Sequence, residues 1–90
     1  ANEIYEYCQS IGLDYSKAIE HVLLDDRVGK SHWQVPGSDG HMGFGGACFP
    51  KDINALIYEF SQRHRKPDIL NAVWAKNLKV RTNNEGKLIP

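Results

Sequence analysis

The sequence has few of the features that would by themselves assign a chain to a class. Two cysteines among 90 residues are too few for a disulfide framework. No apolar run approaches the roughly 18 residues of a membrane span, and no signal-peptide pattern opens the chain. Basic and acidic residues number 11 each, so no net charge favours a polyanion. We expect no membrane partner, no nucleic-acid partner, and a cytoplasmic protein with reduced thiols.

The chain is also short and does not begin with methionine. Ninety residues make one small domain with a thin core. An enzyme that binds two substrates usually needs a longer chain. The first residue is Ala1, which suits a segment of a longer protein. A module or fragment of a larger protein is therefore one expectation.

Two short helices are expected in the first third of the chain. Residues 3–11 carry apolar side chains at helical spacing, and Gly12 suits the position just after a helix end. Asp14 is a plausible N-cap for a second helix. The apolar face of the first helix is Ile4, Tyr7, Cys8 and Ile11, and that of the second is Ala18, Ile19, Val22 and Leu23. Cys8 is expected in the core.

A long loop is expected from Asp25 to Gly46. Six of the eight glycines fall between Gly29 and Gly46, and neither helical nor strand periodicity survives there. Loops of this length are uncommon in compact domains and are often functional. A flexible linker rarely carries large apolar residues, whereas this loop has Trp33, Val35, Met42 and Phe44. The pattern favours a functional loop.

Two further helices are expected after this loop. Pro50 suits the first turn of a helix, Pro67 is expected to end that helix, and Asp68 to cap the next. Their apolar faces are Ile53, Leu56, Ile57 and Phe60, then Ile69, Leu70, Val73, Trp74 and Leu78. The sequence therefore predicts an all-α fold of about four helices with a long glycine-rich loop. Residues 1–81 form the expected domain, and residues 82–90 a polar tail.

The segment GFGGACFPKD, residues 43–52, concentrates glycine, cysteine and charge before the third helix. Gly43 and Gly45 begin a G-x-G-x-x-G pattern, but Cys48 takes its last position and no apolar strand precedes it. A metal site is not expected either, because the spacing of histidine, cysteine and aspartate matches no ligand pattern. The glycines can still let the main chain approach a ligand closely.

Cys48 is the candidate for chemistry in this segment. It precedes Pro50 by two residues, so it is expected at a helix N-terminus, where the helix dipole favours a thiolate. Lys51 adds a positive charge, and Asp52 follows one helical turn later. A thiol beside a carboxylate can attack a carbonyl while the carboxylate handles water or a proton. A buried, inert cysteine at a helix start is an equally good interpretation of these residues alone.

The same ten residues resemble the catalytic-cysteine motif of the UDP-glucose/GDP-mannose dehydrogenase family. The resemblance extends over about residues 2–81, and this segment is similar to the central domain of that family. It is carried by GFGGACFPKD together with Asn2-Glu3, Gly12-Leu13-Asp14, Asp26-Arg27-Val28-Gly29, His32 and Pro36-Gly37. Within the family, the sequence of this motif resembles the UDP-glucose branch more than the GDP-mannose and UDP-N-acetylmannosamine branches.

The resemblance implies an NAD-dependent oxidation of a sugar alcohol to a carboxylate in two steps. It implies that Cys48 forms a thiohemiacetal and then a thioester, and that Asp52 assists proton transfer and water attack. It implies substrate-binding roles for Arg27 and for a loop of Gly43, Phe44, Gly45 and Gly46. It places Lys51 near the cofactor phosphates.

The resemblance also implies that much of the enzyme lies outside these 90 residues. The family's two nucleotide-binding domains are missing, and its catalytic lysine and asparagine lie upstream of Ala1. The chain alone is thus expected to be inactive, with NAD bound by an absent N-terminal domain of a larger α/β dehydrogenase. A homodimer is expected, because family members dimerise through this helical domain.

Two other functions stay open at this point. The first is a stand-alone dimerisation or assembly module without catalysis. The second is a cysteine hydrolase that pairs Cys48 with His41. The sequence shows no third group that would orient such a pair.

Overall fold

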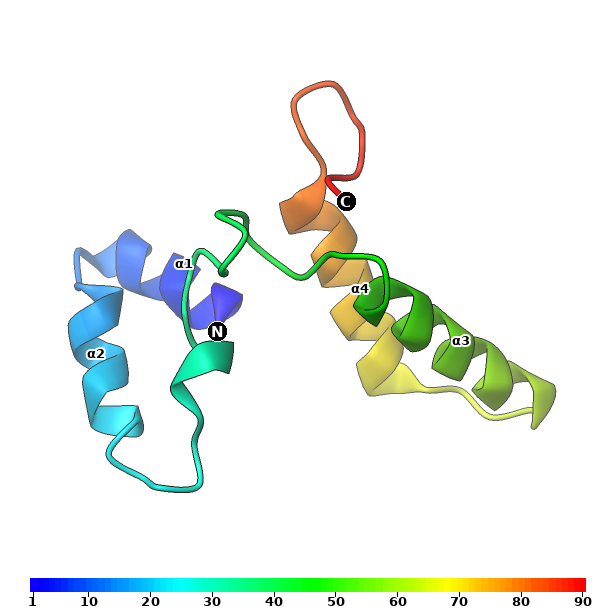
Figure 1. Cartoon of the computed structure of the whole chain (residues 1–90), viewed down its shortest axis with the longest axis horizontal. Helices are drawn as coiled ribbons and strands as arrows, with labels where there is room; N and C mark the ends of the chain where they lie inside the picture. Colours follow the sequence, from blue (N-terminus) through cyan, green and yellow to red (C-terminus); the bar gives the residue numbers. More distant parts are fainter. The chain divides into compact units, whose positions relative to one another are not determined.

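The computed structural model describes residues 1–90 and contains four α-helices and one short 3-10 helix (Figure 1). The chain divides into two compact units, Ala1–Met42 and Gly43–Pro90. The only β pairing is an isolated bridge between Thr82 and Leu88, so the expected all-α class is confirmed. The elements are α1 (Asn2–Ile11), α2 (Tyr15–Val22), η1 (Lys30–His32), α3 (Phe49–Gln62) and α4 (Asp68–Arg81).

The first unit begins with α1 and α2, joined by a tight corner that the sequence predicts correctly. Gly12 has a φ of 74°, the left-handed conformation that glycine adopts without steric cost, and α1 ends there. Asp14 then caps α2, because its Oδ1 accepts hydrogen bonds from the main-chain N–H groups of Ser16 at 2.9 Å and Lys17 at 3.4 Å. Both boundaries are therefore set by local chemistry.

The core of the first unit is small. Cys8, Tyr15 and Ile19 are its buried residues, which confirms the expected core position of Cys8. The Tyr15 hydroxyl donates a hydrogen bond to the carbonyl of Trp33, so the loop after α2 is fastened to the helices. Burial raises the pKa of Tyr15. The η1 turn also gives the expected long loop some regular structure.

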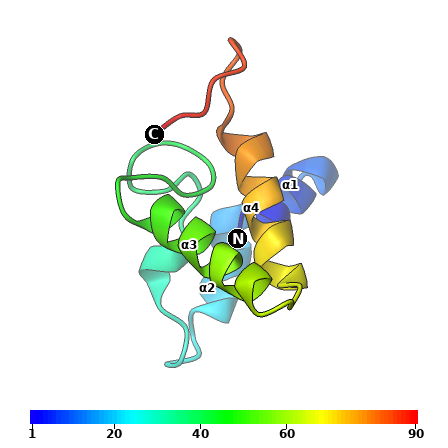
Figure 2. The same ribbon diagram turned by 90° about the vertical axis from the view of Figure 1, so that its right-hand side faces the viewer.

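The second unit contains α3 and α4, which contact each other and run in roughly opposite directions (Figures 1 and 2). Cys48 is the N-cap of α3 and Pro50 lies in its first turn, as the sequence predicts. The predicted end of α3 at Pro67 is wrong. The helix ends at Gln62, and His64 then takes a φ of 54°, which breaks the helical path.

The fourth helix departs from its sequence pattern in two respects. Asp68 is the first helical residue and not the cap, since Pro67 holds the N-cap position without a side-chain hydrogen bond. The predicted apolar face is also partly wrong, because Ile69 is 80% exposed. The fully buried residues of α4 are instead polar, namely Asn77 and Arg81. None of the four helices has the length and hydropathy needed to cross a membrane.

Residues 82–90 fold back on the end of α4. The Ile89 N–H donates to the main-chain oxygen of Arg81 at 2.8 Å. The Arg81 guanidinium donates from Nε to Ile89 O at 3.1 Å and from Nη2 to Pro90 O at 2.9 Å. Arg81 therefore fastens residues 82–90, the predicted polar tail, to the end of α4.

Candidate active site around Cys48

Cys48 is exposed at the N-terminus of α3. Its carbonyl accepts the hydrogen bond from the Asp52 N–H at 2.8 Å, which is the bond that closes the first helical turn. The thiol therefore lies at the positive end of a 14-residue helix and is open to reagents. This placement is the one that the sequence predicts for a reactive cysteine.

The charged neighbours of Cys48 are also accessible. Lys51 Nζ lies 3.8 Å from Asp52 Oδ1, and the two side chains are 69% and 67% exposed. An ion pair at that distance and exposure is weak, because solvent screens it. The Asp52 carboxylate is thus available for other partners, one helical turn after the thiol.

The glycine-rich loop before Cys48 is hydrogen-bonded to α4. The Phe44 N–H donates to Asn77 Oδ1 at 2.7 Å, and Asn77 Nδ2 donates back to Phe44 O at 3.0 Å. The amide side chain thus pairs with both polar groups of one residue, as a neighbouring strand would. Asn77 is 3% exposed, so water does not compete well for these bonds.

Two glycines of the loop are required by its closeness to α4. A Cβ at Gly43 would lie 2.9 Å from Val80 Cγ2 and nearer still to Asn77 Oδ1, and φ there is 71°. A Cβ at Gly45 would lie 2.6 Å from Arg81 Nε and nearer still to Nη2. The loop therefore uses at least these two glycines to pack against polar side chains of its own unit.

The Phe44 side chain joins the loop to both helices of the unit. Its ring meets that of Phe49 edge-to-face with centroids 4.8 Å apart, and that of Trp74 with centroids 6.1 Å apart. Phe49 is the first residue of α3 and directly follows Cys48. Phe44, a predicted substrate-binding residue, thus also has a packing role.

Arg27, the other predicted substrate-binding residue, lies in the first unit and is engaged locally. Its Nε and Nη2 donate to the two carboxylate oxygens of Asp25 at 3.0 Å and 2.7 Å, and its side chain is 89% exposed. The Arg27 guanidinium lowers the pKa of Asp25 below its usual value. A ligand phosphate would have to share or replace this carboxylate.

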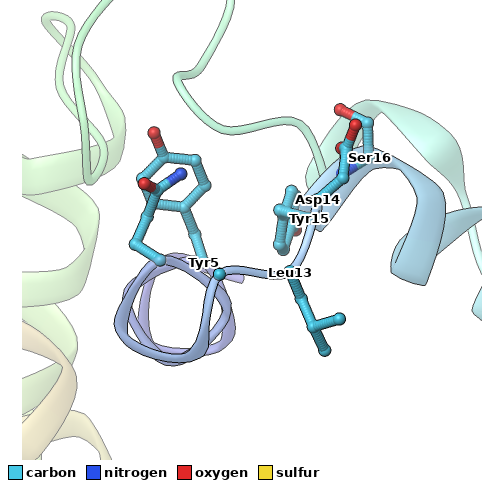
Figure 3. A pocket seen from close by; sticks show the side chains of 7 residues that line it. Tyr5, Leu13, Asp14, Tyr15 and Ser16 are labelled. Carbon is cyan, nitrogen blue, oxygen red and sulfur yellow. The ribbon is translucent and has the colours of Figure 1, made fainter.

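The first unit also has a polar hollow of about 420 Å³ at the corner between α1 and α2 (Figure 3). Tyr5 lines it from α1, and Asp14 and Ser16 line it from the start of α2, while Leu13 points away from the two tyrosine rings. None of the predicted site residues lines this hollow.

His41, the partner of Cys48 in the cysteine-hydrolase alternative, also belongs to the first unit. Its main-chain N–H donates to Asp39 Oδ1 at 3.0 Å.

Asn77 and Arg81 are not among the predicted site residues, although the sequence contains a signal for them. Leu70, Trp74, Asn77 and Arg81 follow at spacings of four, three and four, which is one face of a helix. Two polar residues at core positions of such a face indicate a buried polar contact. The partner of that contact, the loop at Phe44, could not be read from the spacing.

Comparison with known proteins gives the family. The model of the UDP-glucose/GDP-mannose dehydrogenase family, central domain, matches residues 1–79. UDP-glucose 6-dehydrogenase TuaD of Bacillus subtilis is 34% identical over 88 residues, which are 98% of this chain and 18% of TuaD. UDP-glucose 6-dehydrogenase of Pseudomonas aeruginosa is 37% identical over 76 residues, which are 84% of this chain and 16% of that enzyme. No solved structure matches significantly.

The chain belongs to the UDP-glucose/GDP-mannose dehydrogenase family and corresponds to its central domain. The archaeal UDP-glucose 6-dehydrogenase AglM of Haloferax volcanii is also similar, at 32% identity over 80% of this chain and 16% of AglM. The chain therefore spans less than a fifth of the length of these relatives.

Proposed function

We propose that this chain is the cysteine-bearing central domain of an NAD-dependent UDP-glucose 6-dehydrogenase, which converts UDP-glucose to UDP-glucuronate. The observation that carries the proposal is the exposed Cys48 at the start of α3, with Asp52 four residues later in the first turn of that helix. The named relatives supply the substrate, since those described above are UDP-glucose 6-dehydrogenases.

The cofactor site lies outside these residues in this proposal. The described chain has no strand, so it lacks the strand–turn–helix unit that cradles a dinucleotide. Lys51 is the one contribution that we propose, as an exposed cation for the cofactor phosphates. NAD, when bound, accepts the hydride in each oxidation step.

Cys48 acts on the aldehyde that the first oxidation leaves at the sugar C6. Its sulfur adds to the carbonyl carbon, the carbonyl oxygen takes a proton, and a thiohemiacetal forms. Loss of a hydride and a proton from that adduct gives a thioester on Cys48. Water then attacks the thioester carbon, the C–S bond breaks, and the acid and the thiol are released.

Asp52 handles the proton in the hydrolysis step. Its carboxylate is 67% exposed, so a water molecule can reach it, and it lies in the first turn of α3, four residues after Cys48. A carboxylate in this position can take a proton from the attacking water. The weak pairing with Lys51 leaves it free to do so.

The test is a direct assay of the full-length protein that carries residues 1–90. With UDP-glucose and excess NAD, we expect two NADH for each UDP-glucuronate, measured by absorbance and chromatography of the sugar nucleotides. GDP-mannose and UDP-N-acetylmannosamine should react at least about tenfold more slowly, as judged by kcat/KM. Comparable or faster oxidation of either of those sugars would reject UDP-glucose as the substrate.

Asp52→Asn should slow thioester hydrolysis in the same protein. General-base catalysis typically contributes about 10² to 10⁴-fold, so we expect kcat to fall by at least about 10²-fold. The thioester should then accumulate, and intact-protein mass spectrometry after acid quench should show the glycosyl adduct on Cys48.

Asp68→Asn is the matched control for that substitution. Asp68 also lies in the first turn of a helix and also has a lysine ammonium at 3.8 Å, here Lys66. It has no proposed catalytic role, and the variant should keep the wild-type kcat. If Asp52→Asn turns over as fast as Asp68→Asn, the carboxylate is not the base.

A second candidate is association without catalysis. Large apolar side chains on α1 are exposed in the described chain, with Ile4 at 47%, Tyr7 at 61% and Ile11 at 50%. Such a face favours packing against another surface, and a homodimer is the form of it that we propose. A full-length protein that assembles but oxidises none of the three sugars would favour this candidate.

A further inference from the structure

We infer that Asn77 is a positioning residue that holds the glycine-rich loop and, through it, the main chain at Cys48. The inference rests on the proposed function, because it assigns Asn77 a part in the reaction of Cys48. It concerns the second unit alone, which contains residues 43–47 at the end of that loop, the thiol of Cys48 and α4.

Asn77 anchors the loop strongly. Asn77 uses both ends of its amide on Phe44, at 2.7 Å and 3.0 Å, and is 3% exposed. Removing the amide would leave the N–H and C=O of Phe44 without these partners in a buried position. Unsatisfied buried polar groups cost free energy. The loop is thus held at one residue by a two-point contact.

Phe44 is in turn connected to the main chain at the nucleophile. The Phe44 ring packs edge-to-face on Phe49, which is the residue after Cys48. Only three residues, Gly45 to Ala47, separate Phe44 from Cys48 along the chain. The main chain on both sides of the thiol is therefore tied, directly or by ring packing, to the residue that Asn77 fixes.

The position of this main chain matters for the reaction of Cys48. A covalent reaction needs the sulfur, the carbonyl carbon and the base in a near-attack geometry, and a misplacement of about 1 Å can cost on the order of 10²-fold in rate. Asn77 itself is buried and engaged on both sides, so it acts on the reaction through the loop.

The test compares Asn77→Ala with wild type in the full-length protein. We expect kcat for UDP-glucose oxidation to fall about 30- to 100-fold while KM changes less than about threefold. Hydrogen exchange of the Phe44 amide should become at least about tenfold faster, while amides in the middle of α3 and α4 keep their protection. Asn71→Ala is the control, because Asn71 is an exposed asparagine on the same helix, and it should change none of these quantities.

Asn77→Asp keeps the inference testable if the alanine variant does not fold. Aspartate has the same shape and retains an acceptor for the Phe44 N–H, but it places an oxygen against Phe44 O in place of the donor. We expect Phe44 to stay protected and kcat to fall about tenfold. A role in packing alone would leave kcat per folded molecule unchanged.

The inference is overturned if either folded variant has wild-type kcat, or if the Phe44 amide exchanges at the wild-type rate in Asn77→Ala. Failure of the proposed function has a different signature. In that case wild type itself forms no UDP-glucuronate, or Cys48→Ser still forms it. The positioning role of Asn77 in the reaction is then rejected as well, while hydrogen exchange at Phe44 still decides whether Asn77 anchors the loop.

Discussion

Cys48→Ser in the full-length protein should abolish formation of the sugar acid. A serine hydroxyl is far less nucleophilic than a thiolate near neutral pH, so neither the thiohemiacetal nor the thioester should form. We expect acid formation to fall by about 10³-fold or more, on the scale of nucleophile deletions in other enzymes. Oxidation of the alcohol to the aldehyde does not use the thiol. NADH formation should therefore stop at or below one equivalent for each sugar oxidised.

Cys8→Ala provides the matched control for this loss. Cys8 is the only other cysteine, and it is 3% exposed in the core of the first unit. Its replacement should lower stability through a small cavity and leave the two-NADH stoichiometry intact. Acid formation at the normal rate by Cys48→Ser would rule out covalent catalysis by this residue, whatever the Cys8 variant does.

The corner of the first unit and the start of α3 could be predicted because their causes are local. Gly12, Asp14 and Pro50 act on main-chain groups within four residues of themselves, and each stands where the sequence places it. The position of Cys48 follows from the same local signals. The part of the candidate site that lies within one helical turn was thus accessible from sequence.

The supports of the site could not be predicted, because they depend on contacts far apart in the chain. Phe44 and Asn77 are 33 residues apart, and no spacing rule links a loop residue to a helix residue at that distance. The early end of α3 could not be predicted for a different reason. His64 adopts a positive φ although it is not glycine, and the residue type at that position does not by itself indicate this conformation. Sequence patterns gave Asn77 no role, although its polar side chain on an apolar helix face was visible.

These contacts change how the motif residues are understood. The glycines of GFGGACFPKD suggest close approach to a ligand, yet Gly43 and Gly45 are already required by Asn77 and Arg81. The motif and α4 therefore form one structural unit. The proposed chemistry belongs to residues of the motif, and the side chains that hold the motif in place belong to α4. A substitution on α4 can then act on the loop without any contact with substrate.

Arg81→Met should strongly destabilise the second unit. Arg81 is 1% exposed, and its guanidinium donates to Ile89 O and Pro90 O. Methionine can fill part of the same volume, but it leaves both oxygens without these donors. Hydrogen bonds from charged donors are worth roughly 1.5–3 kcal/mol each, so we expect a loss of about 3 kcal/mol. Hydrogen exchange of the α4 amides in the full-length protein should then be on the order of 100-fold faster.

Lys79→Met separates this effect from a general loss of positive charge on α4. Lys79 is an exposed cation two residues earlier, near the same helix end, and its replacement should change exchange by less than about threefold. Arg81→Lys adds a second comparison, because it keeps the charge but not the fork that reaches two oxygens. If Arg81→Lys behaves like wild type, charge alone supports the unit. If Arg81→Met also has wild-type exchange rates, the contacts of Arg81 with Ile89 and Pro90 contribute nothing to stability.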